Sequence, residues 1–272
     1  MEYLKQGTII YGFKSHKYNE NVSYAVIISA RCDIANDKIS KLYYLSAVDA
    51  KAWFVSEAGF HVVYDDYINN VRNDFKQILT KYKLDSELLL KFPLKKGISV
   101  LTEYEENQSK LNKLIEKYTR TYNICSGCLD VDKKIKIIHD NPKNMINFLD
   151  QITKGNMNHY FYLPHSAYSL GGEMHEGLIV DLQEIGILTI EDAKQIKSPG
   201  IDFRLLDKMN ELERKRLQDT YWLQDDTCFV DVEATISSPW CELLMQRFSN
   251  DFIRIGVDGA NKNDFEKLVE LV

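Results

Sequence analysis

Three adjacent side chains, Arg31, Cys32 and Asp33, are of types that catalysis uses. They follow the apolar run 22–30, and the end of a buried strand would hold their backbone rigid while a groove received the side chains. An arginine binds a phosphate through two N–H donors, a carboxylate acts as a general base, and a thiol beside a cation becomes a nucleophile. We take these three residues as the catalytic candidates. The structural alternative makes them a surface charge, a buried small residue and a turn cap.

A second group has part of the spacing of a metal site. Cys125 and Cys128 form a CxxC pair, but a structural zinc ion takes four ligands, usually from two such pairs, and the sequence has no second one. Loops could bring in ligands from the histidines His139, His159, His165 and His175. The metal-site candidates are Cys125, Cys128 and His139, and the alternatives are a redox pair or two ordinary thiols. We expect no cofactor unless this site holds zinc.

Two arginines and two histidines are candidates for binding a nucleic acid or a partner. Arg247 and Arg254 are two helical turns apart, so they share roughly one side of a helix and could reach phosphates or carboxylates. His165 and His175 flank a loop with two glycines, and histidine suits proton transfer near neutral pH. The alternative for all four is a solvated surface position.

Short strands must position these groups. Runs of β-forming residues with polar turns between them predict β-structure over 7–64 and strands near 159–164, 177–182 and 228–234. The run 22–30 has a continuous apolar centre, which indicates burial on both faces. Such short strands are typical of a small barrel or an antiparallel sheet. Residues 134–139 also have a strand-like pattern.

Helices fill the middle of the chain. Apolar residues spaced three and four apart predict amphipathic helices over 68–82 and 101–122, with a break at 92–97. These helices either form a hairpin packed on the sheet or present a coiled-coil-like seam to a partner chain. Proline and glycine positions predict a helix over 142–154, and Thr189 begins a capping box for another.

The last helix begins near 238–239 and carries an apolar side. We expect five residues from this helix and from the run 22–30 to be buried together: Ile27, Ile28, Trp240, Leu244 and Phe248. The elements as a whole predict an α+β protein. Its β-core comes from both ends of the chain, 1–64 and 156–272, and residues 65–155 form a mainly helical insertion.

Composition limits the class of protein. The chain is 44% hydrophobic and 11% aromatic, which excludes a disordered chain. No apolar run approaches the roughly 18 residues of a membrane span, and the N-terminus lacks the pattern of a signal peptide. An odd number of scattered cysteines, five, indicates reduced thiols. We therefore expect a cytoplasmic protein that does not bind a membrane.

The net charge of the chain indicates which class of partner to expect. The formal net charge is −6, which opposes nonspecific binding to phosphates, although a local basic groove would still permit nucleic acid as a partner. A nearby-encoded partner protein or a second copy of the chain are the other expected partners.

Three stretches resemble a group of bacterial proteins that are distantly similar to PemK/MazF-type toxins and are often encoded beside restriction or phage-defence genes. The matching residues are GTII at 7–10 with YAVIISARCDIA at 24–35, YFYLP at 160–164 with GLIVDL at 177–182, and SPW at 238–240 through LMQRF at 244–248 to FIRIGV at 252–257. The resemblance implies an SH3-like β-barrel and, for the toxins, RNA cleavage without a metal.

The chain departs from the toxin pattern at two places. The toxins carry an Arg-Pro pair before the second strand, where this chain has Val22, Ser23 and Tyr24. Their Thr-Ser after the third strand corresponds to Ser46 and Ala47 here. We therefore expect a binding or regulatory module of a phage-defence or toxin–antitoxin-like system, acting with a partner protein. The alternatives are a PemK-like ribonuclease effector and a zinc-supported structural domain.

Overall fold

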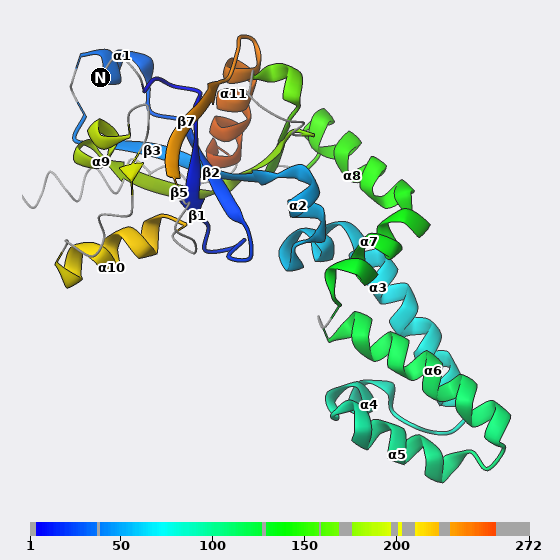
Figure 1. Ribbon diagram of the computed structural model, residues 1–272. Helices are drawn as coiled ribbons and strands as arrows, with labels where there is room; N and C mark the ends of the chain where they lie inside the picture. Colours follow the sequence, from blue (N-terminus) through cyan, green and yellow to red (C-terminus); the bar gives the residue numbers. More distant parts are fainter. Residues whose placement is uncertain are drawn as a thin grey trace, which may run out of the picture. The chain divides into compact units, whose positions relative to one another are not determined.

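A computed structural model describes residues 4–36, 39–126, 129–157, 159–168, 176–196, 201–202, 210–222 and 229–253. Helices and strands both occur, so the expected α+β class is confirmed. The chain divides into two compact units (Figure 1). The sheet unit comprises residues 1–15, 22–49 and 151–272, and the helical unit comprises residues 16–21 and 50–150. The helical unit thus begins near Ala50, earlier than the expected boundary at residue 65.

One antiparallel sheet organises the sheet unit. Its strands are β1 (Thr8–Lys14), β2 (Val22–Ile27), β3 (Lys41–Asp49), β4 (Tyr160–Leu163), β5 (Leu178–Thr189), β6 (Ile201–Asp202) and β7 (Phe229–Thr235). They lie in the order β4-β5-β3-β2-β1-β7-β6. Pairs such as Thr8 with Thr235 join β1 to β7, which confirms that both ends of the chain build one sheet.

The sheet is not closed into a barrel. A barrel needs a continuous ladder between its edge strands, and the described residues show none between β4 and β6. A single isolated bridge, Tyr168 with Ile236, joins the segment after β4 to the segment after β7. Beside this bridge, the N–H and the Oγ of Ser237 both donate to the carbonyl oxygen of Ala167 at 2.9 Å. These contacts do not amount to a ladder, and the expected SH3-like barrel is not confirmed.

Side chains alternate between the two faces of this sheet. On β1, Ile9 packs into one cluster of buried residues and Ile10 into another. Helix α11 (Trp240–Ile253) covers the first face, whereas α1 (Arg31–Ala35), α9 (Ile190–Gln195) and α10 (Glu211–Thr220) contribute to the second. The 3₁₀ helix η1 (His165–Ala167) also adds to the first. Burial of both faces explains the continuous apolar run of β2.

The alternation also corrects one expected cluster. Trp240, Leu244, Phe248 and Ile28 pack on the first face, as expected. Ile27 belongs to the opposite cluster, because successive residues of a strand point to opposite sides. The capping box at Thr189 is confirmed, since its Oγ1 accepts a hydrogen bond from the N–H of Asp192 at 3.1 Å.

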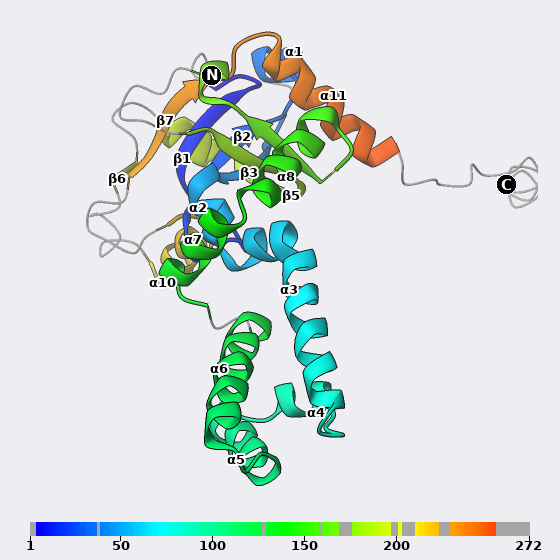
Figure 2. The ribbon, with the colours of Figure 1, turned by 90° about the vertical axis from the view of Figure 1, so that its right-hand side faces the viewer.

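Seven helices were found among residues 50–154 in the parts that the structure describes. They are α2 (Ala50–Val55), α3 (Glu57–Thr80), α4 (Ser86–Lys91), α5 (Leu94–Tyr104), α6 (Gln108–Cys125), α7 (Val131–Asp140) and α8 (Pro142–Lys154). In Figure 2, α3 and α6 run side by side and α5 lies against α6. The expected β-structure over 50–64 is wrong, because Ser56 caps α3 by accepting the N–H of Gly59.

The two apolar stripes are satisfied within the helical unit. Phe75 on α3 stacks against Tyr118 on α6, with ring centroids 5.6 Å apart. The stripe expected over 101–122 is divided between α5 and α6, because Asn107 caps α6 through the N–H of Lys110. Neither the hairpin on the sheet nor the seam with a partner chain is needed to bury these residues.

The strand expected over 134–139 is also wrong. Asp130 accepts the N–H of Lys133 and begins α7. A good cap and tertiary packing outweigh the β-propensity of three isoleucines. The helix expected over 142–154 is confirmed as α8. Among the described residues, no helix combines the length and apolar character needed to cross a membrane.

Leu244 on α11 tests how the first face of the sheet is held. It is 1% exposed within the cluster beneath α11. We expect Leu244→Ala to lower the free energy of unfolding by about 2–5 kcal/mol, because the substitution leaves a cavity. Urea denaturation measures this. Leu212→Ala is the matched control, since Leu212 on α10 is 83% exposed. An equal effect of both substitutions would contradict the packing.

Candidate functional site

The catalytic candidates lie on a short helix and not at the end of a strand. β2 ends at Ile27, and α1 begins at Arg31 after Ala30 as its N-cap. Burial of Ile34 in the second cluster holds this helix on the sheet. Arg31 and Cys32 are exposed and Asp33 is half-buried. The Cys32 Sγ lies 3.5 Å from Asp33 Oδ1, which is a weak contact between neighbours.

Arg31 faces α11. Its Nη2 lies 3.6 Å from the Glu242 carboxylate, and both side chains are more than half exposed. Burial raises the pKa of the Cys241 thiol, although the hydrogen bond and charge of Arg31 oppose this rise. The Arg31 guanidinium thus interacts with both the Glu242 carboxylate and the Cys241 thiol of α11, and it remains exposed to solvent.

The binding candidates are separated by the structure. Arg247 on α11 is half-buried, and its Nη2 lies 3.4 Å from the carbonyl oxygen of Thr153. A Cβ at Gly155 would collide with its guanidinium. Arg247 therefore ties α11 to the end of α8. His165 is exposed on η1. The other two candidates, Arg254 and His175, lie outside the described residues.

The metal candidates are described only in part. Cys125 ends α6, and burial raises the pKa of its thiol against the charge and hydrogen bond of Arg72. His139 is exposed in the last turn of α7, and Cys128 lies outside the described residues. The residues that the structure does describe contain no group of three His, Cys, Asp or Glu side chains suited to a metal ion. Zinc binding stays a prediction.

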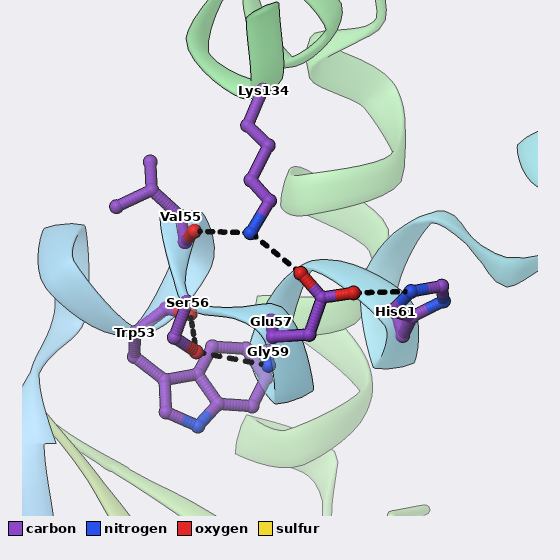
Figure 3. Close-up of polar contacts among 7 residues, drawn as sticks. All are labelled: Trp53, Val55, Ser56, Glu57, Gly59, His61 and Lys134. Atoms are coloured by element: carbon purple, nitrogen blue, oxygen red, sulfur yellow. Dashed lines mark hydrogen bonds and ion pairs between the residues drawn. The ribbon is translucent and has the colours of Figure 1, made fainter. Parts of the chain in front are cut away.

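A buried lysine joins three helices of the helical unit (Figure 3). Lys134 on α7 is 5% exposed. Its Nζ donates to the carbonyl oxygen of Val55 at 3.0 Å and to Glu57 Oε2 at 2.9 Å. Glu57 Oε1 lies 2.9 Å from His61 Nε2. A buried ammonium needs such partners, because an unpaired charge is costly to desolvate.

Glu57 takes its ionised form readily in this network. Burial alone would raise its pKa, but the hydrogen bonds and charges of Lys134 and His61 hold the pKa below the ordinary value. Its place in the first turn of α3 also favours negative charge. The Lys134 ammonium further lies 5.8 Å from the centre of the Phe60 ring. The network fixes α7 to the joint between α2 and α3.

Two adjoining hollows open on the helical unit, and we call them together the α3–α6–α7 cleft. They have volumes of about 500 and 590 Å³ and share Tyr67, Glu116 and Arg120. The further residues lining the first are Asn70, Val71, Asp74, Lys113, Lys117 and Thr121. Those lining the second are Thr119, Asn123, Ile124, Leu129, Lys133, Lys136, Ile137 and Asp140.

The cleft is cationic in an acidic protein. Its charged residues are the cations Lys113, Lys117, Arg120, Lys133 and Lys136 and the carboxylates Asp74, Glu116 and Asp140. Arg120 Nη2 donates to the hydroxyl of Tyr67 at 3.0 Å, which orients the guanidinium across the shared part. An excess of cations here opposes the formal net charge of −6 of the whole chain.

The sequence gives no direct signal for this cleft, because the residues that line it come mainly from three different helices. Arg120 lies between the apolar residues of a stripe that had been assigned to packing. Lys136 lies in the segment 134–139 that was expected to be a strand, and Lys133 directly precedes that segment. The available signal was Asp130, a good N-cap three residues before Lys133, which points to a helix.

The pH dependence of stability tests the Glu57 interaction. Because the folded-state pKa of Glu57 is lowered, its contribution is present above the unfolded value of about 4.5 and is lost as pH falls through the folded value. We expect Glu57→Gln to be less stable than the natural protein at pH 7 and the gap to shrink at pH 3. Urea denaturation at both values measures it, with Glu103→Gln as an exposed control on α5. A gap that grows on acidification would contradict the interaction.

No protein-family model, curated protein or solved structure matches the chain. The similarity to PemK/MazF-type toxins therefore stays a prediction.

Proposed function

We propose that the protein is a binding module that holds an acidic partner protein in the α3–α6–α7 cleft. The observation that carries this proposal is a cleft whose lining combines apolar side chains with an excess of cations. Tyr67, Ile124, Leu129 and Ile137 supply the apolar and aromatic part. Interfaces between proteins have an apolar centre within a polar rim, and arginine and tyrosine carry much of their binding energy.

A protein partner fits the cleft better than a nucleic acid does. Asp74, Glu116 and Asp140 stand among the cations, and each would repel a phosphate backbone. A protein surface can place a cation opposite each carboxylate and a carboxylate opposite each lysine. The net charge of −6 repels an acidic partner from the rest of the surface, so the local excess of cations directs the partner's acidic patch to this cleft.

We base the proposed biological setting on the resemblance in sequence. We place the module in the cytoplasm as part of a bacterial phage-defence or toxin–antitoxin-like system, with a partner encoded nearby. We also propose that its curled sheet is an opened form of an SH3-like barrel. The single bridge between Tyr168 and Ile236 supports this, because it lies where the two edges of such a barrel would meet.

Ribonuclease activity is the weaker alternative. The toxin Arg-Pro pair is absent before β2, and Arg31, the arginine nearest to that region, is shared with Glu242 and Cys241. Arg31 and Cys32 are exposed and Asp33 is half-buried on the short helix α1, so a phosphate bound by the first two would stay in contact with solvent.

Charge reversal in the cleft tests the binding proposal. The protein would be co-expressed with the products of its neighbouring genes, and the affinity of the resulting complex would be measured by calorimetry. We expect Arg120→Glu to weaken that complex at least ten-fold, because the substitution turns an attraction into a repulsion. Lys76→Glu, at an exposed position on α3 outside the cleft, is the control. Equal affinities for both variants would rule out the cleft as the binding site.

A nuclease assay tests the alternative. We expect the isolated protein to leave single- and double-stranded RNA and DNA intact, with and without EDTA, because the toxin residues are missing. Gel electrophoresis of the incubated nucleic acids measures this. Metal-independent RNA cleavage that Asp33→Ala abolishes would favour the ribonuclease function instead.

A further inference from the structure

The pairing of the strands brings tyrosines and carboxylates together at one end of the first face of the sheet. Helix α11 covers another part of this face. Tyr11 on β1 pairs with Tyr24 on β2 and with Asp231 on β7. The two tyrosine rings meet edge to face, 5.3 Å apart. Asp49 ends β3 on the same face, two residues after Ala47, which pairs with Tyr24 and packs beneath α11.

A β-bulge adds a further carboxylate. Ile9 pairs with Ala234 and Ile10 with Val232, so Glu233 is the extra residue between the two pairs. Bulges re-aim side chains and recur beside functional sites. Burial first, and then the charges of Asp49 and Glu233, raise the pKa of Tyr24.

The third tyrosine has an unsatisfied hydroxyl. Tyr168 is 3% exposed, and its hydroxyl oxygen has no hydrogen-bond partner among the described residues. Its bridge to Ile236 holds it at the edge of β7. Burial first, and then the charge of Asp49, raises the pKa of Tyr168, and Tyr168 in turn acts on Tyr24. A buried hydroxyl is normally paired, so the Tyr168 hydroxyl keeps an unused capacity for a hydrogen bond.

We propose that this face binds an organic cation, an ammonium or guanidinium group, between the carboxylates of Asp49 and Glu233 and the rings of Tyr11 and Tyr24. The Tyr168 hydroxyl oxygen would accept one N–H of the ligand. Charge-assisted hydrogen bonds and cation–π contacts are both available to such a group.

Accessibility fits this arrangement. Tyr11, Asp49, Asp231 and Glu233 are half-buried and can meet a ligand, while Tyr24 at 3% exposure forms the floor. Aromatic faces favour an organic cation over a metal ion, which prefers oxygen, nitrogen and sulfur ligands. The site belongs to the sheet unit and goes beyond the proposed function of the cleft, since neither depends on the other.

Calorimetric titration of the full chain tests the site. The cationic probes are N-acetyl-arginine amide, N-acetyl-lysine amide and spermidine, and N-acetyl-citrulline amide is a neutral analogue of the first. We expect at least one cationic probe to bind and the neutral probe to bind at least ten-fold more weakly. Binding of an amide probe alone assigns the cation to a protein side chain, whereas binding of spermidine alone assigns it to a free polyamine.

Variants then locate the bound cation. We expect Glu233→Gln and Asp49→Asn each to weaken binding at least ten-fold, and Tyr168→Phe to weaken it several-fold. Asp219→Asn, an exposed carboxylate on α10, should leave affinity unchanged. Circular dichroism checks that each variant folds. If one of the two carboxylate variants unfolds, the other still tests the site. Absence of binding by every cationic probe, or unchanged affinity in the carboxylate variants or in Tyr168→Phe, would overturn the proposal.

Discussion

Antiparallel pairing of β1 with β7 is the constraint on which the sheet unit depends. It brings Thr8 beside Thr235, so the two ends of the chain must fold together before either has a complete sheet. Both faces of β1 are then buried, with Ile9 on one side and Ile10 on the other. The residues between β3 and β4 leave this sheet and satisfy their own apolar surface, which is why they form a separate unit.

The side chains of the proposed cation site lie where the sheet is irregular and not along its regular ladder. The bulge at Glu233 adds a carboxylate beside Asp49 and Asp231, and Gly12, with a φ of +97°, lies where β1 shifts its register against β2. The bridge at Tyr168 brings a buried hydroxyl to the same place. An unbroken barrel would pair these positions more regularly and would bury the acidic end of the face.

In the helical unit, one buried charge supports the surface that we assign to binding. The ammonium of Lys134 needs Glu57 and the carbonyl of Val55, and this need fixes the rotation of α7. Because Lys134 faces inward, Lys133 and Lys136 on the same helix face the α3–α6–α7 cleft. A stabilising contact and a binding surface thus share one short helix, and a substitution at Lys134 would affect both.

Local patterns in the sequence predicted β1 to β4, β7 and the first part of β5, the later part of α3, the helices α8 and α11 and the capping box at Thr189, because each depends on neighbours a few residues away. They failed at α7, where isoleucines mimic a strand, and at Arg31 to Asp33, where the strand ends earlier than its apolar run. The barrel was not confirmed, since closure depends on distant edges. Only the tertiary structure joined Lys134 to Glu57, Arg120 to Tyr67 and Tyr168 to Ile236, because contacts between residues far apart in the chain leave no periodic signal in the sequence.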